Sequence, residues 1–383
     1  MSRYGNGTQY NLISGAADGS RVGIKGTEDL GGGFKTIFTL ESRLELDTGE
    51  NRNGYLAKNP DFALLKGSPL PAASTLALAN ALGANNAVVN SNGALFDRTA
   101  ILGIMTPVGA ILLGRQYTPA YEVGANADTF ETGSVGTWGG ITLGTSALYT
   151  PGVAIRSSNA IQYRLQMPNG IGVSVMYSPE SQGSGSLGFS NRFVGANLRY
   201  QANGYNIGIG YNQEEDSSGN PSLRTAVAGG SYTNGNMKFF AGYMTMKNDN
   251  PSIGAALNPA ITAALGSSGA SSVPAVISTI NQNARLNEKS YSLGMHYTVG
   301  SGRLMGAIAR TNNALFPGSD VSLISLGYDH NLSPRTDAYL FFAHTINQES
   351  AQYALSSAGY NCGFTTRGGQ DASALQLGIR HRF

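Results

Sequence analysis

Short segments along the chain alternate apolar and polar residues with a period of two. The clearest covers residues 205–213, where tyrosine and isoleucine hold the odd positions up to 211, and asparagine and glycine hold the even ones. Residues 171–177 and 291–297 repeat the pattern. Such alternation predicts β-strands with one apolar and one polar face. The segments are about 9 to 12 residues long, which suits tilted strands that cross a bilayer, so the pattern predicts a transmembrane β-barrel.

The connections between these segments alternate between very short and very long. Tight turns are predicted at 31–33, 106–108, 168–170, 203–204, 234–235, 300–302 and 333–334. After an opening stretch at 5–17, which counts as the first loop, long polar loops are predicted at 48–93, 118–154, 179–191, 214–223, 247–287, 311–320 and 347–373. Short turns on one side and long loops on the other are typical of outer-membrane barrels.

Fifteen strands follow from this scheme: 18–30, 34–47, 94–105, 109–117, 155–167, 171–178, 192–202, 205–213, 224–233, 236–246, 288–299, 303–310, 321–332, 335–346 and 373–383. Single-chain bacterial barrels have even strand numbers. We therefore expect that a first strand is missing, and that residues 1–4 are its last stub. The chain also shows no signal peptide at Met1, so a leader and one strand are expected to be encoded upstream.

The composition agrees with a single all-β barrel domain over residues 1–383. Charged residues make up 13% of the chain, about half the share in ordinary soluble domains, whereas 52 Gly, 19 Tyr and 14 Phe are present. No apolar run approaches the length of a membrane helix.

The net charge of +2, without a basic run, gives no reason to expect a nucleic-acid partner. The single cysteine, Cys362, excludes an intrachain disulfide, and neither a metal nor a cofactor is expected.

Several segments resemble the trimeric general porins of Gram-negative bacteria, particularly the beta-proteobacterial type. They are SRVGIKGTEDLGGGFK at 20–35, LGRQY at 113–117, RSSNAIQY at 156–163 and LGIRHRF at 377–383. The resemblance implies a sixteen-stranded barrel whose third loop folds inward and whose second loop latches onto a neighbouring subunit. It also implies a homotrimer in the cell outer membrane, in contact with lipid and lipopolysaccharide and inserted by the assembly machinery. Alanine-rich stretches at 76–82 and 259–265 could form short helices.

Charged residues on the polar faces are the candidate pore lining. Alternation places Arg21 and Lys25 opposite Val22 and Ile24, hence in the lumen, and it does the same for the two arginines of 155–167. The resemblance, more than the alternation, places an arginine of 94–105 there, and it predicts facing acidic groups on the third loop. The full predicted set is Arg21, Lys25, Arg98, Arg115, Arg156 and Arg164, with Glu122, Asp128 and Glu131 as the acids. Other lumen positions are read as mostly Gly, Ser, Asn and Arg.

These residues predict passive diffusion of small hydrophilic solutes and ions with a preference for anions, because rings of arginine or lysine favour anions in pores. The last strand alternates Leu377, Ile379, His381 and Phe383 on its lipid face. A terminal phenylalanine in this setting resembles the family's assembly signal.

Two other functions stay open at this stage. A substrate-specific porin for an anion such as phosphate or an organic acid differs from a general pore in having a saturable site. A barrel enzyme needs a histidine positioned beside a nucleophile. The histidines, His296, His330, His344 and His381, lie on separate predicted strands, which argues against an enzyme.

Overall fold

The computed structural model describes residues 1–3, 7–49, 63–86, 94–142, 154–180, 192–216, 218–251, 253–357, 360–361 and 365–383. Cys362 lies outside these residues, as does most of the fourth loop, 181–191. None of the described helices is long and apolar enough to cross a membrane.

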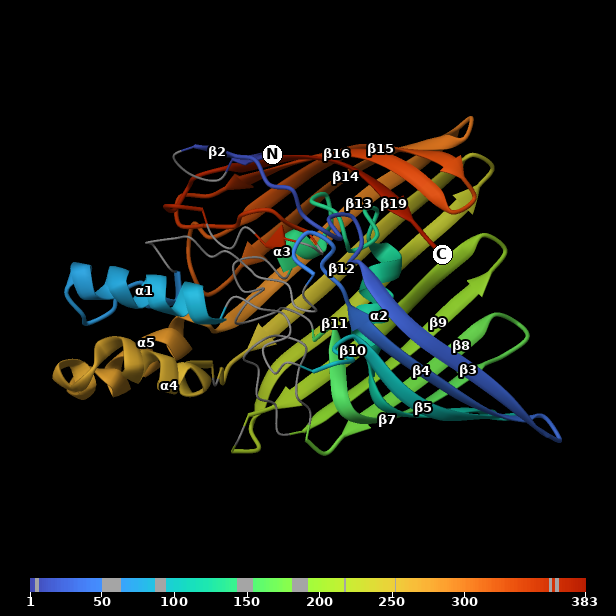
Figure 1. Ribbon diagram of the computed structural model, residues 1–383, viewed down its shortest axis with the longest axis horizontal. Coiled ribbons are helices and arrows are strands. Elements are labelled where there is room, and N and C mark those ends of the chain that lie inside the picture. Colours follow the sequence, from blue (N-terminus) through green and yellow to red (C-terminus); the bar gives the residue numbers. More distant parts are fainter. Residues whose placement is uncertain are drawn as a thin grey trace.

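Strands of eight or more residues build the wall, and within the described part of the chain there are fifteen, as the alternation predicts. They are β3 (Arg21–Gly31), β4 (Phe34–Arg43), β5 (Thr99–Thr106), β6 (Gly109–Tyr117), β7 (Arg156–Gln166), β8 (Ile171–Ser178), β9 (Phe193–Ala202), β10 (Tyr205–Glu215), β11 (Pro221–Asn234), β12 (Met237–Asn248), β13 (Leu286–Val299), β14 (Gly302–Asn313), β15 (Val321–Ser333), β16 (Thr336–Asn347) and β19 (Ala372–His381). Each pairs antiparallel with the next along the chain, and the sheet curls into a barrel (Figure 1).

The seam of the barrel lies between β19 and β3. Two-residue strands stand there in the described part of the chain: β1 (Ser2–Arg3), which pairs with Ser373 and Ala374 of β19, and β2 (Thr8–Gln9), which pairs with β1. The sheet is therefore not closed over its full height at this point. A further short pair, β17 (Ser356–Ser357) with β18 (Tyr360–Asn361), lies in the eighth loop.

The turns at the short-connection end follow the predicted chemistry. Between β9 and β10, Asn203 and Gly204 have φ angles of +53° and +82°. Positive φ at both central residues defines the type I′ turn, whose twist matches that of the flanking strands. Asparagine and glycine tolerate this conformation better than other residues, which explains why the tight hairpin forms at this pair.

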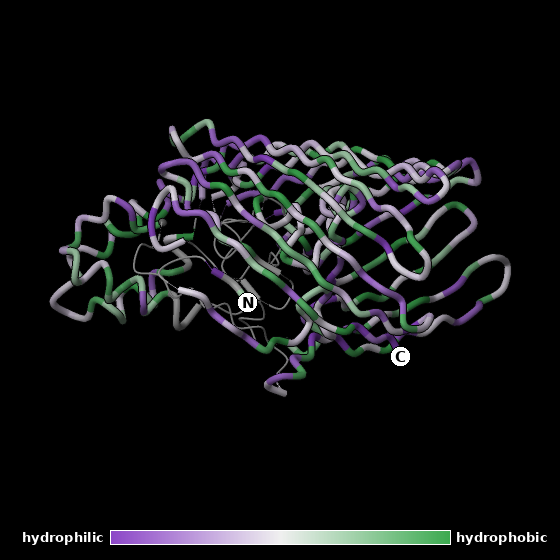
Figure 2. The backbone as a smooth tube through the Cα atoms, turned by 90° about the horizontal axis from the view of Figure 1, so that it is seen from above, coloured by the Kyte–Doolittle hydropathy of each residue, from purple (hydrophilic) through white to green (hydrophobic). Residues whose placement is uncertain are grey.

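The outward face of the wall is apolar, as alternation requires. On β13, Leu293 is 58% exposed and stands beside Ala241 and Ile308 on the neighbouring strands. Ser292, one position away, is 3% exposed and points inward. Hydrophobic and hydrophilic positions alternate in the same way along the strands in Figure 2. This arrangement suits a wall with lipid on one side.

Leu293 lies near the middle of β13, so we expect Leu293→Arg to place a charge near the bilayer midplane. It should destabilise the barrel by roughly 2–4 kcal/mol, measured by urea titration of folding into lipid vesicles. Leu293→Met keeps the surface apolar and serves as the control. Equal stability of the two variants would contradict the assignment of this face to lipid.

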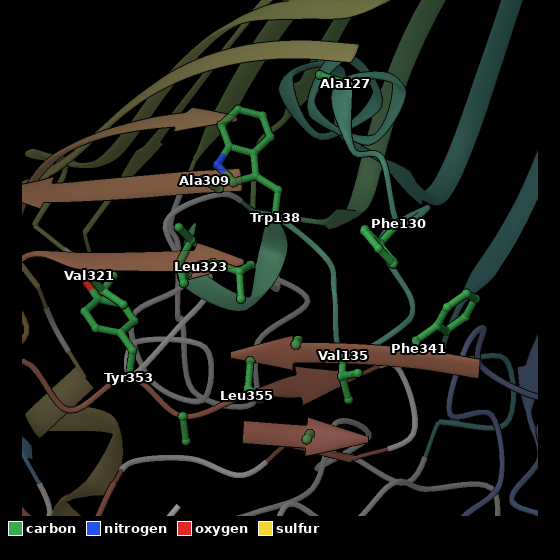
Figure 3. Packing of buried hydrophobic residues seen from close by; sticks show 14 of the residues in the cluster. Ala127, Phe130, Val135, Trp138, Ala309, Val321, Leu323, Phe341, Tyr353 and Leu355 are labelled. Carbon is green, nitrogen blue, oxygen red and sulfur yellow. The ribbon is translucent and has the colours of Figure 1, made fainter. Parts of the chain in front are cut away.

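The lumen face of β11, β12 and β14 to β16 differs from the sequence expectation, because many of its side chains are apolar. The third loop and the eighth loop fold inward and cover it, so these side chains form a closed hydrophobic core instead of a wetted wall. Figure 3 shows Phe130, Val135 and Trp138 of the third loop facing this wall. The wall contributes Val227, Met244, Met246, Met305, Ala309, Val321, Leu323, Tyr339, Phe341 and Ala343, and the eighth loop contributes Ala351, Tyr353, Ala354 and Leu355.

The second and sixth loops form helices beyond the end of the barrel that carries the long loops (Figure 1). The second loop contains η1 (Ala63–Leu65) and α1 (Ala72–Asn86), and the sixth contains α4 (Ile253–Leu265), η2 (Ser267–Ser272) and α5 (Val273–Asn283). They share a small core that includes Leu78, Leu82, Leu257, Ile261 and Ile280. The alanine-rich stretches are thus helical, and the described part of the second loop packs on its own chain.

Candidate pore site

The third loop begins with α2 (Pro119–Ala127), which lies inside the barrel (Figure 1). Proline at its first position suits a helix start, since no intrahelical partner exists for that N–H. Glycines on the facing strands allow α2 to lie close to the wall. A Cβ on Gly210 would be 2.9 Å from the Ala120 Cα, and one on Gly242 would be 2.5 Å from the Trp138 ring. Gly210 on β10 and Gly242 on β12 therefore serve to seat the loop.

Asp128 ends α2 and organises the turn that follows. Asp128 as a residue is 3% exposed. Its carboxylate accepts hydrogen bonds from the backbone N–H groups of Phe130 (2.9 Å), Thr132 (3.2 Å) and Trp138 (3.2 Å), and from the Thr137 hydroxyl. Burial raises the pKa of Asp128 above its usual range, although these hydrogen bonds oppose the shift. The sequence expectation placed Asp128 opposite the arginines; in the structure its bonds stay within its own loop, because the tight turn at 129–138 closes around it.

We expect Asp128→Asn to loosen the third loop. An amide has one acceptor oxygen where the carboxylate has two, so at least one pair of these bonds is lost, and charge-assisted bonds contribute about 1.5–3 kcal/mol each. Faster proteolysis of this loop in the purified protein measures the effect, with Glu122→Gln as control. A loop as resistant as in the wild type, together with altered ion selectivity, would show that Asp128 acts on the pore directly.

Glu131 is the acid of this loop that reaches across to the wall. It and Thr132 adopt left-handed backbone conformations, with φ of +59° and +62°. The carboxylate lies 2.6 Å from Arg303 Nη1 and 3.6 Å from Arg380 Nη1, and its side chain is 43% exposed. Burial raises the pKa of Glu131, but the hydrogen bond and charge of Arg303, with Arg380, outweigh it and leave the pKa lowered. Glu131 is therefore held ionised.

The remaining predicted acid, Glu122, pairs with a predicted arginine. Its carboxylate lies 2.5 Å from Arg164 Nη2 and 3.1 Å from Asn197 Nδ2. Arg164 is on β7, and its side chain is 36% exposed. The loop acids and the wall arginines thus meet, but as local ion pairs and not as two facing rows.

The basic wall centres on Glu41 of β4. Its carboxylate lies 2.6 Å from Arg98 Nε and 3.5 Å from Arg21 Nε, and Arg21 also pairs with Asp18 at 2.8 Å. Gly23 and Glu41 are cross-strand partners, so Arg21, two positions before Gly23, lies on the same face as Glu41, opposite the outward-facing Val22 and Ile24. Lys25 follows on the same face of β3 and is exposed.

Tyr117, at the end of β6, joins two of the predicted arginines. Its hydroxyl oxygen accepts hydrogen bonds from Arg156 Nη2 (2.7 Å) and Arg98 Nη2 (3.3 Å). The Arg156 guanidinium also lies 4.3 Å from the centre of the Tyr117 ring, a cation–π contact. On its other side, Tyr117 stacks on Tyr121 of α2, with ring centres 5.1 Å apart. The ring therefore lies between the wall and the third loop.

Arg115 lies beside this cluster. It donates to the Asp97 carbonyl (2.6 Å) and the Ser158 hydroxyl (2.8 Å). The register of β6 on β7 shifts between Gly114 and Gln116, and Gly114 has a φ of +115°. A Cβ at Gly114 would overlap the Ala100 carbonyl oxygen, so only glycine fits this irregularity. Beyond it, simple alternation no longer tells which face a side chain takes.

A second charged cluster, which the sequence argument largely missed, lies on β14 to β19. Arg303 Nη2 is 2.7 Å from Asp329, and Arg380 Nε is 3.1 Å from Asp337. Arg303↔Asp329 and Asp337↔Arg380 are cross-strand partners. The signal that could have revealed them is that each is a charge on the polar face of a strand with otherwise clear alternation.

The residues of the predicted assembly signal occupy the lipid side of β19 and the end of the chain. Leu377 and Ile379 are 79% and 70% exposed. The rings of His381 and Phe383 meet edge to face, with centres 4.6 Å apart. The other histidines lie on β13, β15 and β16, and the described residues contain no cluster of side chains that could hold a metal.

Known proteins match the chain over nearly its whole length. The family model described as Gram-negative porin matches residues 2–350. Outer membrane porin protein 32 of Delftia acidovorans is 26% identical over 387 residues, covering 100% of this chain and 88% of that protein. An outer membrane porin protein of Bordetella pertussis is 25% identical over 397 residues, covering 99% of this chain and 86% of that protein.

Solved structures share the fold. The anion-selective porin from Comamonas acidovorans has a TM-score of 0.66 at 22% identity, covering 98% of this chain and 92% of that one. OmpF of Salmonella typhi, solved with daunomycin, has a TM-score of 0.58 at 15% identity, covering 100% and 94%. Together with the antiparallel barrel and its inward-folded third loop, the family match shows a passive channel of the outer membrane, not an enzyme. The chain belongs to the Gram-negative porin family.

Proposed function

We propose that this porin passes small hydrophilic solutes and ions with a preference for anions. The observation that carries the proposal is the cluster of arginines around Glu41 and Tyr117. Glu41 lies 2.6 Å from Arg98 and 3.5 Å from Arg21, and the Tyr117 hydroxyl accepts hydrogen bonds from Arg98 and Arg156. We count Lys25 and Arg115 in the same proposed lining. Guanidinium groups stay charged at any biological pH, and basic linings favour anions.

The acidic groups near the pore support the same sign of selectivity. Glu122 and Glu131 of the third loop are engaged by Arg164 and Arg303, at 2.5 and 2.6 Å. Glu41 is shared between two arginines, at 2.6 and 3.5 Å. An exposed carboxylate with a nearby guanidinium attracts passing cations less than a lone one does. The solved relative named as an anion-selective porin has the same fold.

The zero-current potential across a planar bilayer tests the proposal. With a tenfold gradient of KCl around 0.1 M, the potential should take the sign set by chloride. The preference should weaken toward 1 M salt, where the screening length falls from about 10 Å to about 3 Å. A potential that takes the sign set by potassium at low salt would overturn the proposal.

A substrate-specific anion channel is the second candidate, favoured by the contact of Arg156 with the stacked pair Tyr117 and Tyr121. Such a stack offers a platform that a general pore does not need. Saturation of the single-channel current with millimolar phosphate or an organic acid would support this candidate, and a linear rise would support the general pore.

We also propose that the protein acts as a homotrimer of single-domain barrels. The side of the barrel on either side of the seam exposes Val22 and Ile24 at 59% and 60%, and Leu377 and Ile379 at 79% and 70%. A neighbouring subunit would cover these apolar side chains. The latch by the second loop, contact with lipopolysaccharide and recognition of Phe383 by the assembly machinery belong to the same proposal. The trimer is tested by comparing the gel mobility of the unheated wild-type protein with that of the unheated Leu377→Asp variant.

A further inference from the structure

Tyr117 holds an unusual position between the two arginines. The side chains of Arg98 and Arg156 are almost buried, since the two residues are each 8% exposed, whereas Tyr117 is partly exposed. An anion in the lumen therefore feels the charge of the arginines but has little direct access to them. Their shared partner is the more accessible group.

The hydroxyl of Tyr117 has a proton to donate. Both of its hydrogen bonds in the described part of the chain are accepted by the oxygen, from Arg98 and Arg156. No acceptor for its own O–H is present among these residues. Hydrogen bonds in a chain polarise one another, so an oxygen that accepts from two cations makes its O–H a stronger donor.

The third loop restrains the ring that carries this hydroxyl. Tyr121 stacks on Tyr117 at 5.1 Å and donates its own hydroxyl to Thr132 Oγ1 at 3.3 Å. Thr132 is next to Glu131, which forms an ion pair with Arg303. The ring of Tyr117 is thus held from the wall by Arg156 and from the lumen by the loop, which restricts its rotation.

We propose that Tyr117 determines which anions this pore favours, by donating its O–H to oxyanions as they pass. The inference rests on the proposed anion preference and adds a chemical class to it. Carboxylates and phosphates accept short, charge-assisted O–H···O⁻ hydrogen bonds, whereas chloride is attracted to the arginines mainly as a point charge. The hydroxyl therefore favours oxyanions over halides, and the arginines favour anions over cations.

Tyr117→Phe separates these contributions. The phenyl ring keeps the stack on Tyr121 and the contact with Arg156, and only the oxygen is lost. We expect the acetate-to-chloride permeability ratio, and likewise the phosphate-to-chloride ratio, to fall by about three- to tenfold. The chloride-to-potassium ratio should stay within about twofold of the wild type. Tyr211→Phe is the matched control, because it removes a tyrosine hydroxyl from the outward face of β10, where Tyr211 is 41% exposed, and it should leave the oxyanion ratios unchanged.

Different results would overturn the inference in distinguishable ways. If the wild type prefers anions but Tyr117→Phe keeps its oxyanion ratios, the hydroxyl does not contact the solute and the proposed function still stands. If the chloride-to-potassium ratio falls as far as the acetate ratio, Tyr117 only positions the arginines and does not discriminate among anions. A wild type that prefers cations contradicts the proposed function and this inference together.

Discussion

Arg156→Glu is expected to lower the chloride-to-potassium permeability ratio on the order of fivefold at 0.1 M salt. The substitution changes the charge of the basic wall by two units, next to Arg98 and Tyr117. Charges about 8 Å from the ion path, in surroundings close to water, change an ion's energy by about 0.5 kcal/mol per unit, and about 1 kcal/mol corresponds to roughly fivefold. The new carboxylate should also pair with Arg98, which is how the second unit of this change acts on the wall.

Zero-current potentials at several salt concentrations measure this effect. The shift should be largest at low salt and small at 1 M, because screening shortens the reach of each charge. Arg335→Glu carries the same change of charge in the exposed turn between β15 and β16, so it is the matched control and should shift the potential little. An unchanged potential in Arg156→Glu, or an equal shift in both variants, would contradict the role of the basic wall.

The lipid face of this barrel could be predicted from the sequence because lipid imposes the same requirement on every strand. Residues such as Leu293 and Leu377 must be apolar wherever they point outward, so the period of two is visible without knowledge of the loops. The fifteen long strands follow from it.

The lumen face could not be predicted in the same way, since its environment depends on segments far away in the chain. Phe341 is 4% exposed because Phe130 of the third loop packs on it, with ring centres 5.7 Å apart. When the position of the third loop is unknown, an apolar residue at a lumen position breaks the expected alternation, and the segment is interpreted as an irregular strand. The glycines against which α2 packs, among them Gly210, indicate in the sequence only a small residue on the polar face, and not a contact with a helix.

The geometry of the pore itself depends on local backbone conformations that the pattern does not reveal. Tyr117 shares its position in the alternation with Ile111 and Leu113, which point to lipid. The register shift after Gly114 interrupts that alternation before Tyr117 is reached. Similarly, nothing in the order of residues separates Asp128, whose carboxylate the loop surrounds, from Glu131, which reaches the wall.

Glu131→Gln is expected to increase the anion preference about twofold at 0.1 M salt. The carboxylate engages Arg303 at 2.6 Å and Arg380 at 3.6 Å, and its removal leaves both guanidinium groups with less compensation on the lumen side. Arg303 is still held by Asp329 at 2.7 Å, and Arg380 by Asp337 at 3.1 Å, so the arginines should stay in place. One unit of charge is removed, which accounts for a smaller effect than in Arg156→Glu.

The same substitution should also alter the response to acid. The pKa of Glu131 in the folded protein is lowered from its ordinary value of 4.5, so its ion pairs stabilise the third loop above that pH. This contribution is lost as the pH falls through the lowered folded-state pKa.

In the wild type, protonation of Glu131 in that acidic range should raise the anion preference and increase current noise from a looser loop. Glu131→Gln should show both features already at neutral pH and lack the acid-induced change at this site. Glu122→Gln, which disturbs the contacts of Glu122 with Arg164 and Asn197, is the control. If Glu131→Gln shifts the zero-current potential toward cations, or if its loop is as quiet as in the wild type at every pH, then Glu131 neither compensates the arginines nor fastens the third loop to the wall.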